Sequence, residues 1–152
     1  MLVLLSPSKT QDFASTSPTE RFSEPRFLPE ASDLVAGLRQ LTAETLATRL
    51  GTSNRIARAT REAYQTWGSE GATRSRQAVF AYTGEVYRTF DARTLSAGDL
   101  AWAQRHVRIL SALYGLLRPL DRIEPYRLDL TDAVRAGAAG SLAAFWRARI
   151  AE

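Results

Sequence analysis

The sequence predicts a mixed α+β fold, a single globular domain with several helices and a few short strands. Its 152 residues are typical of one domain, and a hydrophobic fraction of 45% supplies an ordinary core. Helical periodicity is clearest over residues 53–67, whereas residues 2–5 and 107–130 hold short runs typical of strands. Both kinds of element in a chain of this length favour the α+β class.

The first fifty residues predict one strand, one loop and two helices. The apolar run 2–5 predicts a buried strand, which we expect at the centre of the fold. Residues 11–29 hold three prolines among serines and threonines and predict an extended, ordered or semi-ordered loop. A helix is expected to start at Pro29, and a second at an N-cap formed by Thr42 and to end near Gly51.

Residues 53–67 predict an amphipathic helix. Its apolar face is expected to carry Ile56, Ala59, Ala63 and Trp67, with Ile56 and Trp67 buried. Arg58 and Arg61 fall on the opposite face and should be exposed. This basic face has two interpretations, a solvated surface or a surface that faces phosphates.

The second half of the chain alternates helix and strand signals. Residues 79–82 predict a strand, followed by a break at 83–84 and a helix towards Asp91. Ser96 is a suitable N-cap for a helix over 98–105. Residues 107–130 predict strands and turns rather than one long helix, because Pro119 would disrupt a helix. Ser141 is expected to cap a last helix.

Composition excludes several classes of chemistry. The chain has no cysteine, so a disulfide, a thiolate metal site and a cysteine nucleophile are all excluded. His106 is the only histidine, which excludes a histidine-rich metal site, and we expect no cofactor. No apolar run is long enough to cross a membrane, and the N-terminal run is too short for a signal peptide. We therefore expect a cytoplasmic protein without a membrane partner.

The charge of the chain indicates an anionic partner. The net charge is +4 and the isoelectric point is about 10.0. The basic excess lies in two blocks: residues 52–76 and residues 101–127 each carry five arginines against two acidic residues. A chain with 19 arginines keeps a single lysine, Lys9.

The segment Ser-Pro-Ser-Lys-Thr directly follows the first predicted strand. Its hydroxyls, backbone N–H groups and one ammonium are the components of an oxyanion site, which would contain Ser6, Ser8, Lys9 and Thr10. A compact ammonium enters a confined site that a planar guanidinium does not fit. The alternative is a plain turn after the strand.

A second candidate site lies within residues 110–128. Gly115 stands among bulky apolar residues, a pattern that suits a hairpin whose backbone approaches something closely. Arginines bind phosphate and tyrosines stack on bases, so the candidate binding residues are Tyr114, Gly115, Arg118, Arg122, Tyr126 and Arg127. The alternative is that the tyrosines belong to the core and the arginines pair with Asp121, Glu124 and Asp129.

Three blocks of the sequence resemble the peroxide-stress protein YaaA family. They are LVLLSPSKT, FAYTGEVYRTFDARTLS and HVRILSALYGLLRPLDRIEPYRLDL, and they occur in the family's order. The resemblance runs from Met1 to the Phe145–Trp146 pair. Family members are longer, so residues 1–152 would be the N-terminal portion of a longer family domain, from either a truncated or a naturally short member.

The resemblance implies a cytosolic DNA-binding protein that is induced by hydrogen peroxide and limits free intracellular iron. It implies a family-specific mixed fold with a helix-hairpin-helix-like element and a basic cleft. The motif match places Ser6, Ser8, Lys9 and Thr10 in the family's opening block, and it carries over no catalytic residue.

Two function classes follow. The first is a stress protein that protects DNA and protein by binding double-stranded DNA largely independently of sequence, with no enzymatic activity expected. The second is an enzyme whose phosphorylated or nucleotide substrate binds at the Ser-Pro-Ser-Lys-Thr segment. A closed pocket around Lys9 would favour a small molecule, and an open basic surface would favour a duplex.

Overall fold

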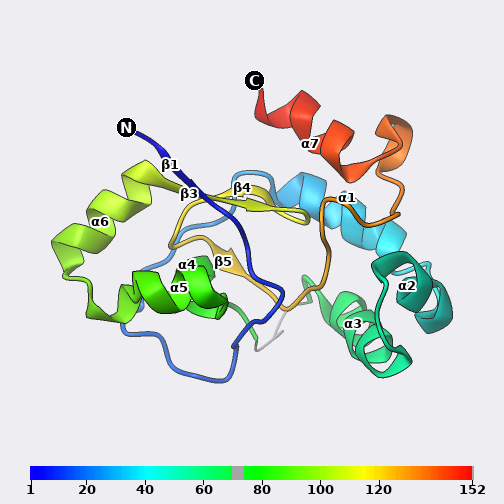
Figure 1. The fold of residues 1–152 in the computed structure, drawn as a ribbon, viewed down its shortest axis with the longest axis horizontal. Coiled ribbons are helices and arrows are strands. Elements are labelled where there is room, and N and C mark those ends of the chain that lie inside the picture. Colours follow the sequence, from blue (N-terminus) through cyan, green and yellow to red (C-terminus); the bar gives the residue numbers. More distant parts are fainter. Residues whose placement is uncertain (70–73, 152) are drawn as a thin grey trace. The chain divides into compact units, whose positions relative to one another are not determined.

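The computed structural model describes residues 1–69 and 74–151 (Figure 1). The chain divides into two compact units. Unit 1 comprises Met1–Arg26, Thr73–Ser111 and Leu116–Pro125, and unit 2 comprises Phe27–Ala72, Ala112–Gly115 and Tyr126–Glu152. Helices and short strands occur together, so the predicted mixed α+β class is confirmed. The expectation of a single domain stays a prediction.

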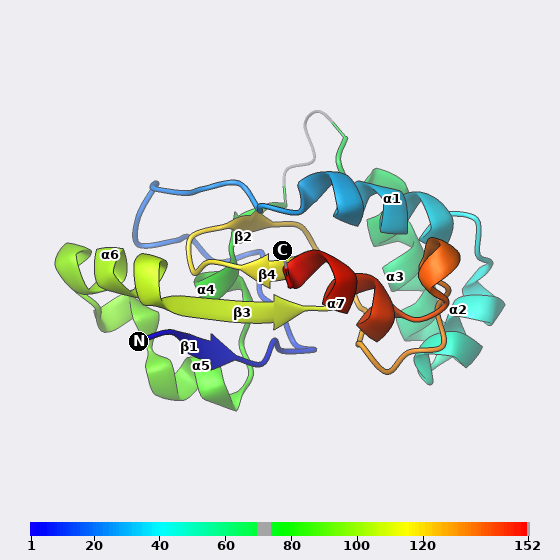
Figure 2. The ribbon, with the colours of Figure 1, turned by 90° about the horizontal axis from the view of Figure 1, so that it is seen from above.

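The main sheet has the strand order β1-β3-β4, formed by β1 (Val3–Leu5), β3 (Val107–Ser111) and β4 (Gly115–Leu117). Strands β1 and β3 run parallel (Figure 2). In their register, Val3 lies opposite Val107. The strand β3 is therefore central, and the prediction that the first strand is central was wrong. The prediction that it is buried was also wrong: β1 is an edge strand, and its alternate residue Leu4 is 59% exposed.

The remaining elements of unit 1 are one small sheet and three helices. The strands β2 (Arg76–Gln77) and β5 (Arg122–Ile123) pair antiparallel. The helices are α4 (Ala78–Ala81), α5 (Glu85–Phe90) and α6 (Ala97–His106), with a 3-10 turn η1 (Ala92–Thr94) between the last two. The loop predicted over residues 11–29 is confirmed up to Phe27, and isolated bridges attach it at Gln11 and Ser23.

The predicted strand at residues 79–82 was wrong, since α4 occupies this segment. All four α4 residues are buried. Periodicity cannot separate a buried strand from a buried helical turn in so short an apolar run. The turn is fixed at its start because the N–H of Ala78 donates to Asp121 O at 2.8 Å and that of Val79 donates to Pro119 O at 3.0 Å.

The helices on either side of η1 confirm their predicted start signals. The Ser96 hydroxyl accepts from the N–H of Asp99, and the Asp99 carboxylate accepts from the backbone of Ser96, which makes a capping box for α6. The helix α5 follows the predicted break at Gly84 and ends at Phe90, and the next residue, Asp91, adopts the left-handed conformation.

Unit 2 consists mainly of helices. They are α1 (Leu28–Leu38), α2 (Ala43–Leu50), α3 (Asn54–Thr66) and α7 (Leu142–Ile150), with a 3-10 turn η2 (Gly137–Ala139). The predicted N-caps Thr42 and Ser141 both accept a backbone N–H, and a proline stands in the first turn of α1. Only residues 51–53 separate α2 from α3, and the two helices pack against each other.

The buried face of α3 differs from the predicted face. Trp67 is buried and Arg58 and Arg61 are exposed, as expected, but Ile56 is only half-buried. The buried line runs through Ala57, Thr60 and Tyr64 instead. This line has the same helical spacing, and Tyr64 brings far more surface into the core than the alanines at 59 and 63.

No helix in the described part of the chain is both long and apolar enough to span a bilayer.

Candidate functional site

The first candidate segment, residues 6–10, is an exposed turn in unit 1. The Ser8 hydroxyl donates to Thr10 O at 2.9 Å, so the turn is closed by its own side chains. Tyr87 from α5 donates its hydroxyl to Ser6 O at 2.6 Å. Gly84 lies so close that a Cβ there would be 2.7 Å from Ser8 Oγ. The segment is therefore held against the start of α5.

Lys9 lies on the surface of unit 1. Its side chain is exposed, and the described residues give its ammonium no hydrogen-bond or ion-pair partner. The narrow anion site that excludes arginine stays a prediction, and the exposure of Lys9 favours the alternative of a plain turn after the strand. Strand β1 lies at the edge of the sheet, and the chain after it runs towards solvent. Lys9 therefore lies outside the core.

Tyr114 and Tyr126 are core residues of unit 2. They are 1% and 6% exposed, and their rings make an edge-to-face contact with centroids 5.6 Å apart. The indole N–H of Trp67 donates to the Tyr114 hydroxyl at 2.9 Å. The alternative in which the tyrosines belong to the core therefore holds, and neither ring is placed to stack on a base.

The close approach predicted at Gly115 is an approach to Trp146. The glycine has φ +69°, and a Cβ there would lie 2.6 Å from Cζ3 of the indole. The Trp146 N–H donates to Ala112 O at 2.7 Å, which fixes the ring over the hairpin. The glycine thus serves the packing of unit 2.

Arg118 and Arg122 form ion pairs within unit 1. Arg118 donates through Nε to the fully buried carboxylate of Asp121 at 3.1 Å and forms a salt bridge to it at 3.0 Å. Arg122 pairs with Glu24 at 3.0 Å and lies over the ring of Phe22 at 3.9 Å. The predicted partner Asp121 is confirmed for Arg118, whereas the partner of Arg122 is Glu24.

Arg127 belongs to unit 2 and is half-buried. Its backbone carbonyl accepts the Tyr64 hydroxyl at 2.5 Å, and burial raises the pKa of Tyr64. The candidate residues are therefore divided: Ser6, Ser8, Lys9, Thr10, Arg118 and Arg122 belong to unit 1, and Tyr114, Gly115, Tyr126 and Arg127 belong to unit 2.

The exposed face of α3 carries three arginines. Arg55, Arg58 and Arg61 recur every three residues and are all exposed. Neither Arg55 nor Arg58 has a hydrogen-bond or ion-pair partner in the described part of the chain, whereas Arg61 donates through Nε to Leu41 O at 3.3 Å. The amphipathic pattern of residues 53–67 was the signal for this face.

Unit 1 also contains a buried arginine that the sequence did not single out. Arg76 is 4% exposed and donates to the Phe80 carbonyl at 2.8 Å and to the carbonyl and carboxylate of Asp12. Burial lowers the pKa of Arg76, and Asp12 opposes this. The hydroxyl of Ser15, the N–H groups of Ser15 and Ala14, and to a smaller extent Arg76 lower the pKa of Asp12 to about 2.

Replacing Asp12 with asparagine should destabilise the chain at neutral pH and have little effect at pH 2. The folded pKa of about 2 lies below the ordinary 3.8, so the carboxylate stabilises the fold above pH 4 and loses this effect as the pH falls towards 2. The measurement is the difference in Tm between the parent and Asp12→Asn at several pH values. A difference as large at pH 2 as at pH 7 would contradict the assignment.

Within residues 1–69 and 74–151, no three histidine, cysteine or acidic side chains lie close enough together to hold a metal ion.

Comparison with known proteins decides the family. A model of the family described as peroxide stress protein YaaA matches residues 1–152. This chain belongs to the peroxide stress protein YaaA family. The resemblance seen in the sequence blocks is thus confirmed.

Several proteins that are similar in sequence to this chain carry the name UPF0246 protein. One from Burkholderia multivorans is 43% identical over 151 residues, which is 99% of this chain and 58% of the relative. Another from Verminephrobacter eiseniae is 46% identical over 154 residues, which is 100% of this chain and 59% of the relative. The chain therefore spans less than two thirds of the length of these relatives.

Proposed function

We propose that this chain acts in the cytoplasm in the peroxide-stress response as a protein that binds double-stranded DNA largely independently of sequence. In this proposal the bound DNA is shielded, and the whole protein also helps to lower free iron. The iron part is supported by the family resemblance alone. Without a cysteine and with one methionine, the chain has few side chains with which to reduce peroxide itself, so protection would be indirect.

The DNA-binding proposal rests on two arginines, Arg55 and Arg58, on the exposed face of α3. Arg55 and Arg58 are exposed and have no protein partner among the described residues. A phosphate can therefore bind them without breaking an existing ion pair. Arg61 extends the row to about 9 Å along the helix axis, at 1.5 Å per residue.

The helix pair α2–α3 suits the helix-hairpin-helix-like element that the family resemblance implies. The two helices are joined by residues 51–53, and Ser53 caps α3 with its hydroxyl on the N–H of Ile56 at 3.3 Å. The start of α3 therefore presents Arg55 near the positive end of the helix dipole. Both features favour a phosphate partner at this end of the helix.

The arginines of the central block are weaker candidates for DNA contacts. Arg118 is bound to a fully buried carboxylate, and Arg122 is bound to Glu24. The enzymatic alternative at residues 6–10 also has less support, because Lys9 is exposed and the Ser8 hydroxyl is already bonded to Thr10.

The double variant Arg55→Gln/Arg58→Gln is expected to bind a short DNA duplex about 60-fold more weakly than the parent at about 0.1 M salt. Each lost phosphate contact reduces the number of counterions released on binding by about 0.9. This lowers the affinity about eightfold at this salt concentration. Fluorescence anisotropy with a labelled duplex of unrelated sequence measures the affinity.

A matched control is Arg88→Gln/Arg147→Gln. It removes two exposed arginines outside α3 and so makes the same change in net charge. We expect less than a threefold loss of affinity. Equal losses in the two double variants would show that only net charge matters, and unchanged binding by the α3 variant would overturn the proposed interface.

A further inference from the structure

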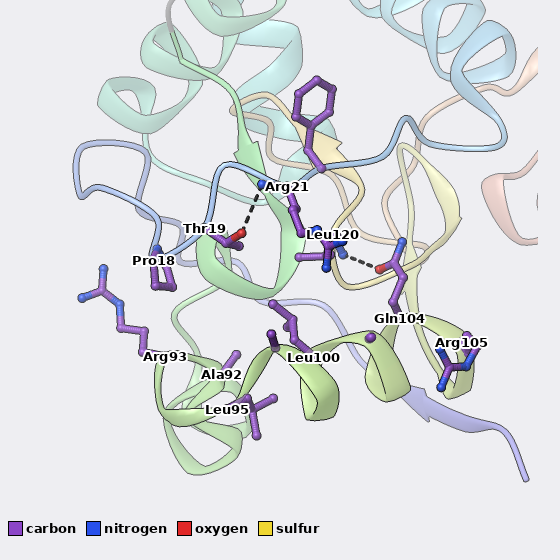
Figure 3. Close-up of a pocket in the computed structure, with 13 residues that line it drawn as sticks. Pro18, Thr19, Arg21, Ala92, Arg93, Leu95, Leu100, Gln104, Arg105 and Leu120 are labelled. Atoms are coloured by element: carbon purple, nitrogen blue, oxygen red, sulfur yellow. Dashed lines mark hydrogen bonds between the residues drawn. The ribbon is translucent and has the colours of Figure 1, made fainter.

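Unit 1 contains a pocket of about 510 Å³ that none of the candidate residues lines (Figure 3). It lies between the loop at residues 18–22, the turn η1 and the helix α6. Its volume is within the range of small-molecule sites in proteins. The lining residues are Pro18, Thr19, Arg21, Phe22, Ala92, Arg93, Leu95, Ala97, Leu100, Ala101, Gln104, Arg105 and Leu120.

The floor of this pocket is apolar and belongs to the core. Ala92, Leu100 and Leu120 are buried and form one hydrophobic cluster with Val79 and Phe80. Packing against Val79 and Phe80 holds these floor residues in place. The pocket is therefore formed before any ligand binds. It can remove the apolar part of a ligand from water.

The pocket rim is positively charged. Arg21, Arg93 and Arg105 come from three separate elements and are arranged around the apolar residues (Figure 3). None of the described residues that line the pocket is acidic. Arg21 and Arg105 are exposed and their guanidinium groups have no partner in the described part of the chain, whereas Arg93 donates to Thr16 O at 3.0 Å.

The neutral polar side chains on the wall are already hydrogen-bonded. Thr19 Oγ1 accepts from the backbone N–H of Arg21 at 3.1 Å. The Gln104 amide donates to Ser23 Oγ at 2.8 Å and accepts from the N–H of Leu120 at 2.8 Å. Ser23 in turn donates to the buried Asp121 at 2.6 Å, so this network holds the wall in place. The groups available to a ligand are therefore the apolar floor and the guanidinium groups of the arginines at the rim.

We propose that this pocket binds an amphipathic organic anion, a molecule with an apolar ring or chain and one sulfonate, carboxylate or phosphate group. The apolar body would lie on Ala92, Leu100 and Leu120, and the anionic group would bind Arg21 or Arg105 at the rim. An uncharged molecule with the same apolar body would leave the rim unused and bind more weakly.

The test uses 1-anilinonaphthalene-8-sulfonate, whose aromatic body and single sulfonate match this class. We expect saturable fluorescence enhancement with one site per chain. Decanoate should compete with the dye, and decanol should compete at least tenfold more weakly. Arg21→Gln/Arg105→Gln should weaken dye binding about tenfold or more, because it removes the charge-assisted contacts.

Ala101→Trp should abolish binding by filling the pocket from α6 without changing its charge. Ala97→Trp does the same from a more exposed position and replaces it if the first variant fails to fold. Arg88→Gln, an exposed arginine of unit 1 outside the pocket, should bind the dye as the parent does. No saturable binding up to millimolar dye, or binding unchanged by the filling and rim variants, would overturn the proposal.

Discussion

Gly115→Ala is expected to lower the free energy of unfolding by about 2–5 kcal/mol. A left-handed backbone costs a non-glycine residue about 1–2 kcal/mol, and overpacking of a core adds about 1–3 kcal/mol. Both apply here, since φ is +69° and the new methyl group would lie 2.6 Å from the indole of Trp146. The indole cannot easily move away, because its N–H donates to Ala112 O and its ring contacts Phe27.

The matched control is Gly51→Ala. This glycine also has a positive φ, +58°, but a Cβ there would meet nothing within 4 Å. It therefore reports the backbone cost alone, about 1–2 kcal/mol. Urea unfolding of both variants measures the difference, and an equal loss in the two would contradict a close contact between Gly115 and Trp146.

Asp121→Ala is expected to cost about 3–5 kcal/mol of unfolding free energy. The carboxylate is fully buried and accepts from Ser23 Oγ at 2.6 Å, from the N–H of Arg118 at 2.8 Å and from the Arg118 side chain at 3.1 Å. Removing it leaves several donors without an acceptor. It also releases the segment whose carbonyl groups fix the start of α4.

The exposed pair in the same unit is the control for this prediction. Glu24 and Arg122 are 54% and 40% exposed, and pairs of this kind contribute about 1 kcal/mol or less. We therefore expect Glu24→Gln to change the unfolding free energy by under about 1 kcal/mol. Equal effects of Asp121→Ala and Glu24→Gln in urea unfolding would show that burial does not strengthen the Asp121 pair.

Local signals predicted much of the fold. The caps at Thr42, Ser96 and Ser141 need only their own side chain and the next turn of backbone, so sequence is sufficient to locate them. The burial of the first strand depends on its place in the sheet order, which no local pattern contains. The prediction for the run at 79–82 failed for the same reason, since the start of this segment is set by hydrogen bonds that Ala78 and Val79 donate to the carbonyl groups of Asp121 and Pro119.

The candidate site was harder to predict than the fold. The sequence pattern of an arginine near a tyrosine is the same whether the arginine binds DNA or a buried carboxylate. Only the three-dimensional partners separate Arg118, which is paired, from Arg55 and Arg58, which are not. The pocket of unit 1 gave no sequence signal, because its three arginines are spread over 85 positions between Arg21 and Arg105.

The dependence of DNA affinity on salt tests the proposed α3 interface most directly. For the parent, log affinity should fall linearly with log salt at about −0.9 per contacted phosphate. We expect a slope shallower by about 1.8 for Arg55→Gln/Arg58→Gln, since two contacts are lost, and an unchanged slope for Arg88→Gln/Arg147→Gln. Parallel lines for the parent and the α3 variant would contradict the claim that these two arginines bind phosphates.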